Sequence, residues 1–350
     1  MAKTSGKPTQ YRFSFGPWNI HEGADPFGPT VRRPVPFAKK IRLYRALGFE
    51  GVQFHDDDAV PEVDSRSDRQ VRQAAGKVRR MLDGEGLVAE FVAPRLWESP
   101  MTVDGAYTSN DPKARRYALE RSFRCIDIAN ELGTHKIVLW LAREGTYIRE
   151  AKPARQAHGW LLDAINAMLD YDPNVQILIE PKPNEPMDHA YVPTIGHAIA
   201  MAYQSKDPAR VGGLIETAHA KLAGLDPSDE MAFALHHGKL WSVHLNDQNG
   251  LKFDEDKSFG AANLREAFNQ VRVLEEGGYG RNGEFVGLDV KAMRTQRQDK
   301  ATAHLANSKR FFELMVEKVR TLDRKAEAAF IAARDYEGLE RLVIEHLLGV

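Results

Sequence analysis

The sequence predicts an α/β protein built as a (β/α)8 barrel with a short C-terminal helical arm, because two patterns alternate along most of the chain. Short runs rich in β-branched residues indicate strands, and longer segments with apolar residues near a 3.6-residue period indicate helices. A strand followed by a helix, repeated, favours a parallel sheet. Eight such units favour a closed barrel, and 350 residues can supply one barrel with insertions.

The elements are expected at the following places. The strand candidates are 11–15, 51–54, 88–92, 136–140, 176–180, 211–216, 241–245 and 287–289. The helix candidates between them are 37–47, 68–82, 112–132, 160–169, 194–204 and 263–276. A further helix is expected over 302–319, followed by a charged, alanine-rich tail over 323–350.

This order of elements predicts two parts, a catalytic barrel over residues 1–320 and a C-terminal helical arm over 321–350. The arm ends in apolar residues between 342 and 348. Their spacing fits a helix folded back on its own barrel and equally fits an arm that docks on a neighbouring subunit.

Composition excludes several classes of function. Lys and Arg number 48 against 49 Asp and Glu, so the formal net charge is −1 and no broad positive field exists to hold a nucleic acid. The first ten residues are polar, and no run of about 18 apolar residues occurs, so we expect a cytoplasmic protein without a membrane partner. The single cysteine, Cys125, falls in a predicted helix and is expected to be a small buried hydrophobe.

Residues of the types that can bind metal ions stand at the ends of five predicted strands. They are His55, Asp58, Glu180, Glu216, His219, His244 and Asp289. One acidic residue at a strand end is usually a helix cap. The carboxyl ends of barrel strands converge on one mouth, where the active sites of this fold lie, so five such strands together predict a site.

Local spacing adds ligands to this set. Glu216 and His219 lie three residues apart where a strand turns into its loop, which lets both face one cavity. Asp254 and Asp256 would point the same way in extended backbone. Oxygen ligands with one or two imidazoles suit Mg²⁺, Mn²⁺ or Co²⁺, and the lack of thiolates argues against a structural zinc site.

The segment 180–186 contains three prolines directly after a strand, which stiffen it. Glu180 and Lys182 would share one face of this segment, where one could bind a metal and the other could polarise a substrate oxygen. The alternative is an exposed ion pair in a stiff loop.

With these residues assembled, the chain resembles the xylose isomerases, especially the shorter actinomycete type, over almost its whole length. The segments that carry the resemblance are 13–18, 23–28, 54–58, 108–111, 143–145, 180–186, 193–197, 216–219, 223–225, 252–256 and 344–349. Long motifs that recur in the same order are far more specific than one short pattern.

The resemblance implies a TIM barrel enzyme that interconverts an aldose with its ketose by a hydride shift between C1 and C2 of the open-chain sugar. It also implies two divalent cations per subunit that polarise the two oxygens. The first cation would be held by Glu180, Glu216 and Asp289, and the second by Glu216, His219, Asp254 and Asp256.

The resemblance further implies roles for individual side chains. His55, oriented by Asp58, would assist opening of the sugar ring, and Lys182 would bond the carbonyl oxygen at C1. A metal-bound water near Asp256 would take the proton of the C2 hydroxyl. Lys291, with Arg294, would support Asp289.

Aromatic residues complete the expected site. Trp18, Trp97 and Trp140 would wall the sugar and exclude water, with Trp97 standing where the family has a phenylalanine. Phe27 matches a phenylalanine that the family inserts into the active site of an adjacent subunit. The resemblance therefore implies a homo-oligomer, a dimer or a tetramer.

The chain departs from the family at several positions. His244 stands where the family has an aspartate as the fourth ligand of the first cation, and this loss of one negative charge should weaken Mg²⁺ relative to Mn²⁺ or Co²⁺. Ser242 replaces a histidine, and Ala93 with Pro94 replaces a pair of threonines, so the resemblance leaves the preferred aldose open, with xylose the first expectation.

Three other functions compete with this interpretation. A histidine at the position of His244 is similar to the rhamnose isomerases and ketose 3-epimerases, so a rhamnose-type isomerase, or a one-metal epimerase or sugar lyase that uses only Glu180, Glu216, His244 and Asp289, is the main alternative. A metal-dependent nuclease is disfavoured by the balanced charge. An inactive sugar-binding barrel is disfavoured by the presence of His55 and Lys182.

Overall fold

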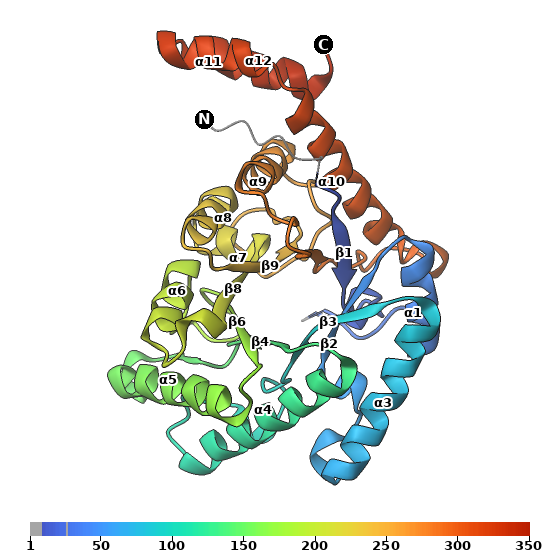
Figure 1. Ribbon diagram of the computed structural model, residues 1–350, viewed down its shortest axis with the longest axis vertical. Coiled ribbons are helices and arrows are strands. Elements are labelled where there is room, and N and C mark those ends of the chain that lie inside the picture. The colour runs from blue at the N-terminus through green and yellow to red at the C-terminus, as the bar shows by residue number, and fades with distance from the viewer. Residues whose placement is uncertain (1–8, 26) are drawn as a thin grey trace.

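The computed structural model describes residues 9–25 and 27–350, and eight parallel strands close into a barrel in the order β1-β10-β9-β8-β6-β4-β3-β2 (Figure 1). The strands are β1 (Arg12–Phe15), β2 (Gly51–His55), β3 (Val88–Ala93), β4 (Lys136–Trp140), β6 (Gln176–Glu180), β8 (Val211–Glu216), β9 (Leu240–Leu245) and β10 (Phe285–Leu288). Each contains residues of one predicted strand, so the predicted barrel is confirmed. A small antiparallel pair, β5 (Gly145–Thr146) and β7 (His189–Ala190), lies outside the barrel.

Helices surround the barrel (Figure 1). They are α1 (Phe37–Ala46), α2 (Asp56–Ala59), α3 (Asp68–Glu85), α4 (Pro112–Leu132), α5 (Ala154–Tyr171), α6 (Ile195–Gln204), α7 (Thr217–Leu222), α8 (Pro227–His236), α9 (Leu264–Gly277) and α10 (Ala303–Thr321). Short 3-10 turns are η1 (Pro17–Asn19), η2 (Val63–Ser65), η3 (Pro100–Thr102), η4 (Arg149–Ala151), η5 (Pro208–Arg210) and η6 (Gln298–Lys300). All seven predicted helices are present, whereas α2, α7 and α8 were not predicted.

The strand register brings the predicted ligands to a common level. Glu216 pairs with His244, and His244 pairs with Gly287, in neighbouring strands. Trp140 pairs with Glu180 in the same way. The carboxyl ends of these strands therefore present their side chains to one mouth, as the barrel geometry predicts.

Two irregularities interrupt the ladder. Between β2 and β3, Val52 pairs with Ala89 and Gln53 with Phe91, so Glu90 is an extra residue. Between β8 and β9, Gly213 pairs with Leu240 and Leu214 with Ser242, so Trp241 is an extra residue. Such bulges change which face of the sheet a side chain reaches.

The barrel interior has an apolar half and a polar half. The apolar half comprises Phe91, Ala93, Val138, Leu178 and Leu214, which pack together. The polar half comprises the buried residues Ser14, Gln53, Glu90, Ser242 and His244. The larger apolar cluster, which includes Phe15, Ile137 and Val286, packs between the strands and the helices.

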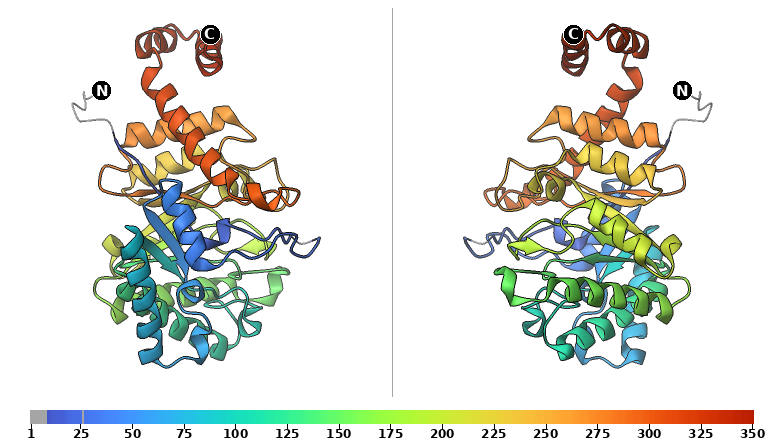
Figure 2. Two further views of the ribbon diagram at one scale, coloured as in Figure 1. Left: turned by 90° about the vertical axis from the view of Figure 1, so that its right-hand side faces the viewer. Right: turned by 90° about the vertical axis from the view of Figure 1, so that its left-hand side faces the viewer.

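The end of the chain forms two helices, α11 (Arg324–Ala333) and α12 (Tyr336–Leu348), which stand off the barrel beside the end of α10 (Figures 1 and 2). Glu327 pairs with Arg272 of α9. Their exposed apolar side chains include Ile331, Tyr336, Ile344 and Leu348. The division into a barrel and an arm at residue 320, and the surface on which the arm docks, stay predictions. Among the described residues, no helix is long and apolar enough to cross a membrane.

Candidate metal centre

A cavity of about 790 Å³ opens at the carboxyl ends of the barrel strands. Thirteen predicted site residues line it: Trp18, His55, Trp97, Trp140, Glu180, Lys182, Glu216, His219, His244, Asp254, Asp256, Asp289 and Lys291. This volume lies within the range of about 300–1,000 Å³ that is usual for sites of small molecules. Two predicted residues, Phe27 and Asp58, are not among the lining residues.

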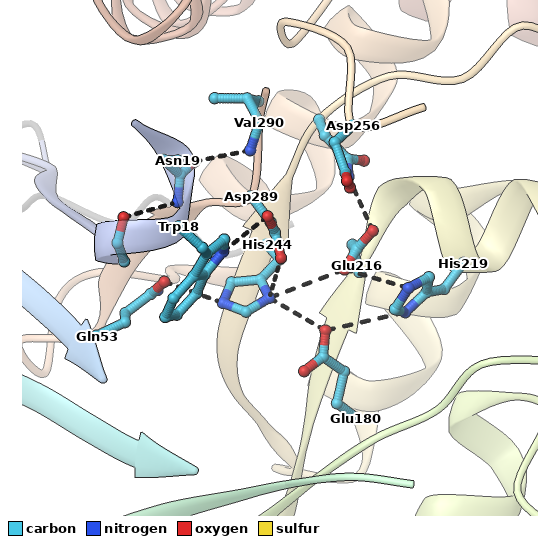
Figure 3. A network of polar contacts seen from close by, with 12 residues as sticks. Trp18, Asn19, Gln53, Glu180, Glu216, His219, His244, Asp256, Asp289 and Val290 are labelled. Carbon is cyan, nitrogen blue, oxygen red and sulfur yellow. Dashed lines mark hydrogen bonds and ion pairs between the residues drawn. The ribbon is translucent and has the colours of Figure 1, made fainter. Parts of the chain in front are cut away.

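Three groups of acidic and imidazole side chains meet in this cavity and share Glu216, and Figure 3 shows the two groups that contain an imidazole. The groups are Glu180 with Glu216 and His219, Glu216 with His244 and Asp289, and Glu216 with Asp254 and Asp256. In each group the possible ligand atoms lie within 4.8 Å of one another. The residues that the sequence predicts as ligands of two cations are therefore gathered in one place.

Each side chain reaches this place from a strand end or the segment after it. Glu180 and Glu216 end β6 and β8, His244 lies in β9, and His219 lies in the first turn of α7. Glu216 is also the N-cap residue of α7, so the helix begins directly after the strand. This sharp turn lets His219 face back into the cavity.

Asp254 and Asp256 lie in the loop after β9. A bridge between Asp247 and Lys257 holds the base of this loop, and the amide of Lys291 donates to the carbonyl oxygen of Asp256 at 2.7 Å. Asp256 has a φ of 47°, in the left-handed region that aspartate tolerates better than most residues. The extended backbone assumed from the sequence is therefore wrong, although both carboxylates still reach Glu216.

The imidazoles lie close to the carboxylates. His244 Nδ1 is 3.1 Å from Glu180 Oε1, 3.9 Å from Glu216 Oε2 and 4.0 Å from Asp289 Oδ2. His219 Nε2 is 3.1 Å from Asp254 Oδ2 and 3.3 Å from Glu216 Oε2. Both rings thus lie between carboxylates that would otherwise repel one another.

The pKa values of the carboxyl groups reflect this crowding. Burial, together with the charges of Asp254 and Asp289, raises the pKa of Glu216 well above its usual range. Burial and the charge of Asp254 also raise the pKa of Asp256 to about 8. Burial would raise the pKa of Glu180 too, but the neighbouring His244 and His219 outweigh it and lower this pKa to about 2. The cluster has more negative charge than its own side chains neutralise.

The donor set fits a divalent cation. Two buried atoms in the cluster, His219 Nδ1 and Asp254 Oδ1, have no hydrogen-bond partner among the described residues. Buried polar atoms rarely stay unpaired, so these atoms indicate a ligand. Carboxylate oxygens with imidazole nitrogens suit Mg²⁺, Mn²⁺, Co²⁺ or zinc, and the one thiol, Cys125, is buried in α4.

An aromatic wall borders the cluster. The indole of Trp18 donates to Asp289 Oδ1 at 2.8 Å, and its ring lies 4.3 Å from the ring of His55, centroid to centroid. Trp97 lies 5.0 Å from His55 and 4.5 Å from Trp140. The three predicted tryptophans, with the ring of His55 between Trp18 and Trp97, therefore form one continuous side of the cavity.

Lys182 lies between the wall and the cluster. Its Nζ is 2.8 Å from Asp254 Oδ2, 3.1 Å from Glu185 Oε2 and 5.3 Å from the ring centre of Trp140. Burial alone would lower the pKa of Lys182, but Asp254 and the other carboxylates raise it. The side chain is therefore an ammonium group that can donate hydrogen bonds into the cavity.

Comparison with known proteins identifies the family. The family model described as xylose isomerase-like TIM barrel matches residues 41–298. A xylose isomerase from Thermus thermophilus is 34% identical over 332 residues, which cover 93% of this chain and 84% of that protein. The chain belongs to the xylose isomerase-like TIM barrel family.

Solved structures resemble the chain in fold. A D-psicose 3-epimerase, solved in the presence of D-fructose, has a TM-score of 0.63 with 14% identity, covering 87% of this chain and 99% of that one. The IolI protein, solved with a zinc atom, has a TM-score of 0.62 with 14% identity, covering 88% and 99%. At these identities the likeness concerns the fold alone.

Within this family fold, the pair formed by His55 and Asp58 has an unpredicted neighbour. His55 Nδ1 is 3.1 Å from Asp58 Oδ2, as the resemblance implies, and Asp58 also accepts from the amide of His55. The guanidinium of Arg95 lies 2.6 Å from the same Nδ1 and 2.8 Å from Asp57 Oδ1. A guanidinium donates only, so Arg95 and Asp58 compete for opposite hydrogen-bonding states of His55 Nδ1.

Two residues lie elsewhere than the family pattern implies. Lys291 was expected beside Asp289, but its ammonium bonds to Asp256. Burial would lower the pKa of Lys291, but Asp256 and Asp289 raise it. Phe27 is 85% exposed on the segment after η1, and its nearest described aromatic partner is Phe253, 6.3 Å away between ring centres. That segment projects from the barrel (Figure 2). The insertion of Phe27 into an adjacent subunit stays a prediction.

Sequence reasoning missed Arg95, Gln53 and Asn246. Asn246 donates to Glu216 Oε1 at 2.8 Å and to Asp256 Oδ1 at 3.3 Å, and thereby orients the carboxylate that all three groups share. Its position two residues after His244 at a strand end was a usable signal. Gln53 and Arg95 gave no such signal, because their partners lie on distant parts of the chain.

Proposed function

We propose that the protein is a metal-dependent aldose–ketose isomerase that acts on the open-chain form of a sugar, with xylose as the first substrate to test. The observation that carries the proposal is one cavity in which three groups of possible metal ligands share Glu216 beside His55 and Lys182. A xylose isomerase 34% identical over 93% of the chain supports it.

The candidate ligands divide into two sets around the shared Glu216. The first set, Glu180, Glu216, His244 and Asp289, follows the distances from His244 Nδ1. The second set, Glu216, His219, Asp254 and Asp256, follows the distances from His219 Nε2 and the grouping of the two aspartates with Glu216. Bound divalent cations would polarise the oxygens on C1 and C2 of the sugar. The crowding that raises the pKa of Glu216 and Asp256 would be relieved when positive charge enters the cluster.

The chain's own side chains would position the sugar and move protons. The His55–Asp58 pair, bordered by Trp18 and Trp97, would transfer the proton needed to open the sugar ring. The ammonium of Lys182 would donate a hydrogen bond to the carbonyl oxygen at C1, where negative charge develops.

Asp256 and the tryptophan wall would have two different roles in the hydrogen transfer. Asp256 lies on the cavity within the second ligand set, where the proton of the C2 hydroxyl would be taken up beside it. The wall of Trp18, Trp97 and Trp140 would keep solvent away from C1 and C2.

The experiment strips the protein of metal, restores Mn²⁺, Co²⁺ or Mg²⁺ one at a time, and assays a panel of aldoses for ketose. We expect ketose with at least one cation, and none in the presence of excess chelator. In D2O, the ketose should retain the substrate hydrogen, because a hydride shift does not exchange with solvent. Lys182→Met should lose most of the turnover while keeping the fold. A protein that binds Mn²⁺ yet converts no aldose would refute the isomerase.

A one-metal ketose 3-epimerase is the second candidate, because an imidazole replaces a carboxylate in the first set. His244 Nδ1 faces Glu180, Glu216 and Asp289, which form a complete set without the second group. Incubation with ketoses would give a product inverted at C3. That activity should survive Asp254→Asn, whereas an isomerase that needs both cations should not.

A further inference from the structure

A polar network lies beneath the first ligand set, inside the barrel. Its members are Ser14, Gln53, Glu90, Ser242 and His244, all no more than 3% exposed. They come from β1, β2, β3 and β9, and β3 and β9 are not neighbours in the sheet. The contacts therefore cross the barrel interior, where each polar atom without a partner would be costly.

Glu90 is the centre of this network. Its carboxylate accepts hydrogen bonds from Ser14 Oγ, from Ser242 Oγ at 2.7 Å and from Gln53 Nε2 at 3.1 Å. A carboxylate accepts and does not donate, so it binds the NH2 end of the Gln53 amide and not the oxygen. The orientation of the amide is determined by this contact.

The amide oxygen of Gln53 consequently faces His244. Gln53 Oε1, which can only accept, lies 3.1 Å from His244 Nε2, so Nε2 carries a hydrogen and donates it to Gln53 (Figure 3). The other nitrogen, Nδ1, points to the carboxylates of the first ligand set, the closest being Glu180 Oε1 at 3.1 Å. A histidine ligand commonly has its second nitrogen bonded in this way, which selects the tautomer and the ring orientation.

The backbone is shaped to permit these contacts. Glu90 is the extra residue of the bulge in β3, which turns its carboxylate into the interior. Gly287 of β10 leaves the space that the amide occupies, since a Cβ there would collide with Gln53 Nε2 and with the carbonyl oxygen of Val243.

Two departures from the family pattern belong to the same network. Ser242, in place of a histidine, and His244, in place of an aspartate, lie two residues apart on β9 and face the same side. Ser242 bonds to Glu90, and His244 is connected to Glu90 through Gln53. The two substitutions are therefore physically coupled.

We propose that Gln53, held by Glu90, is a positioning residue that makes His244 a ligand through Nδ1. The inference rests on the metal role of His244 in the proposed function. Gln53 touches neither the cavity nor the substrate, and it acts on the cation through the imidazole ring.

The test measures Mn²⁺ affinity by calorimetry on metal-stripped protein. Gln53→Met keeps the size of the side chain but removes the acceptor, and we expect the affinity for Mn²⁺ to fall about 10- to 100-fold. Gln270→Met is the matched control, because Gln270 is also a buried glutamine, bonded to Thr217 and not to a cluster residue. It should leave the affinity unchanged.

A double-mutant cycle separates positioning from general damage. In the His244→Asp background the ring is gone, so adding Gln53→Met should cause no further loss of Mn²⁺ affinity. The proposal would be overturned if Gln53→Met lowered Mn²⁺ affinity equally in both backgrounds, or if it did not lower this affinity in the wild-type background.

A second measurement needs no variant. Nitrogen-15 NMR of the Mg²⁺-loaded wild type should show a protonated Nε2 and an unprotonated Nδ1 on His244, and the reverse tautomer would overturn the proposal. Failure of the proposed function is distinguishable, because wild type that binds Mn²⁺ but forms no ketose refutes only the isomerase. Wild type that binds no Mn²⁺ refutes both.

Discussion

The two halves of the barrel interior solve the same packing problem by different means. The apolar half, with Phe91, Val138, Leu178 and Leu214, is held by contacts that depend on volume. The polar half around Glu90 is held by hydrogen bonds whose donors and acceptors must match. An apolar core tolerates exchanges of similar volume, whereas one wrong partner in a buried polar network leaves an atom unpaired. The polar half therefore specifies one arrangement, beneath the candidate metal centre.

The largest expected effect comes from the residue that all three ligand groups share. If the proposed pair of cations shares Glu216, Glu216→Gln should lower kcat by about 10³-fold or more, because each cation would lose a carboxylate worth several kcal/mol in the transition state. The same change should raise the melting temperature of metal-free protein, since burial and the charges of Asp254 and Asp289 make ionisation of Glu216 unfavourable. Steady-state kinetics and calorimetry measure the two effects. A variant with reduced stability in the metal-free state would contradict the account of crowding.

The contrast between the halves is sharpened by paired substitutions of similar size. Glu90→Gln introduces an NH2 group where Ser14, Ser242 and Gln53 all donate, and should cost about 1–3 kcal/mol of the free energy of unfolding, or more. Leu178→Met in the apolar half should cost less than about 1.5 kcal/mol. Urea denaturation of metal-free protein compares them, and equal costs would remove the distinction.

Outside the interior, His304 tests the cost of a buried imidazole whose Nδ1 has no hydrogen-bond partner among the described residues. Burial, and then the charges of Arg32 and His21, lower its pKa to about 4, despite the bond from its Nε2 to the carbonyl oxygen of Asn19. In the unfolded chain His304 takes up a proton below about pH 6.5, whereas in the folded chain it does so only near pH 4. Stability should therefore fall as pH falls through this window, by about 2 kcal/mol at pH 5.

His304→Gln should remove this part of the pH dependence, measured as the difference in the free energy of unfolding between pH 7 and pH 5. His189→Gln, at an exposed histidine, is the control and should leave the dependence as it is in the wild type. Identical slopes for wild type and His304→Gln would contradict the prediction.

The smallest expected effect on stability is at Phe27. Because this ring is 85% exposed, Phe27→Ala should change the free energy of unfolding by no more than about 0.5 kcal/mol. If the ring enters the cavity of an adjacent subunit, the same variant should nevertheless lower kcat/KM. The measurement is kcat/KM at protein concentrations at which the subunits are associated and at concentrations at which they are dissociated. Unchanged kcat/KM in the assembled protein would argue against the insertion.

Much of the candidate site could be predicted because topology alone brings it together. Strands 176–180 and 211–216 were recognisable from their apolar runs, and parallel strands in a closed barrel must present Glu180 and Glu216 at the same mouth. The ligands therefore converge whatever the details of packing. Helix α8 escaped prediction because its buried face includes Pro227 and Ser228, which weakens the apolar period.

The contacts that tune the site depended on register across the barrel. Gln53 and His244 are 191 residues apart, and the network around them includes strands with two bulges, one that adds Glu90 to β3 and one that adds Trp241 to β9. A shift of one residue reverses the face that a strand side chain occupies, and no local sequence pattern indicates such a shift. Local periodicity thus establishes which elements form and which ends meet. The identity of each hydrogen-bond partner is decided when distant strands pack, because only packing determines which donors and acceptors are buried together.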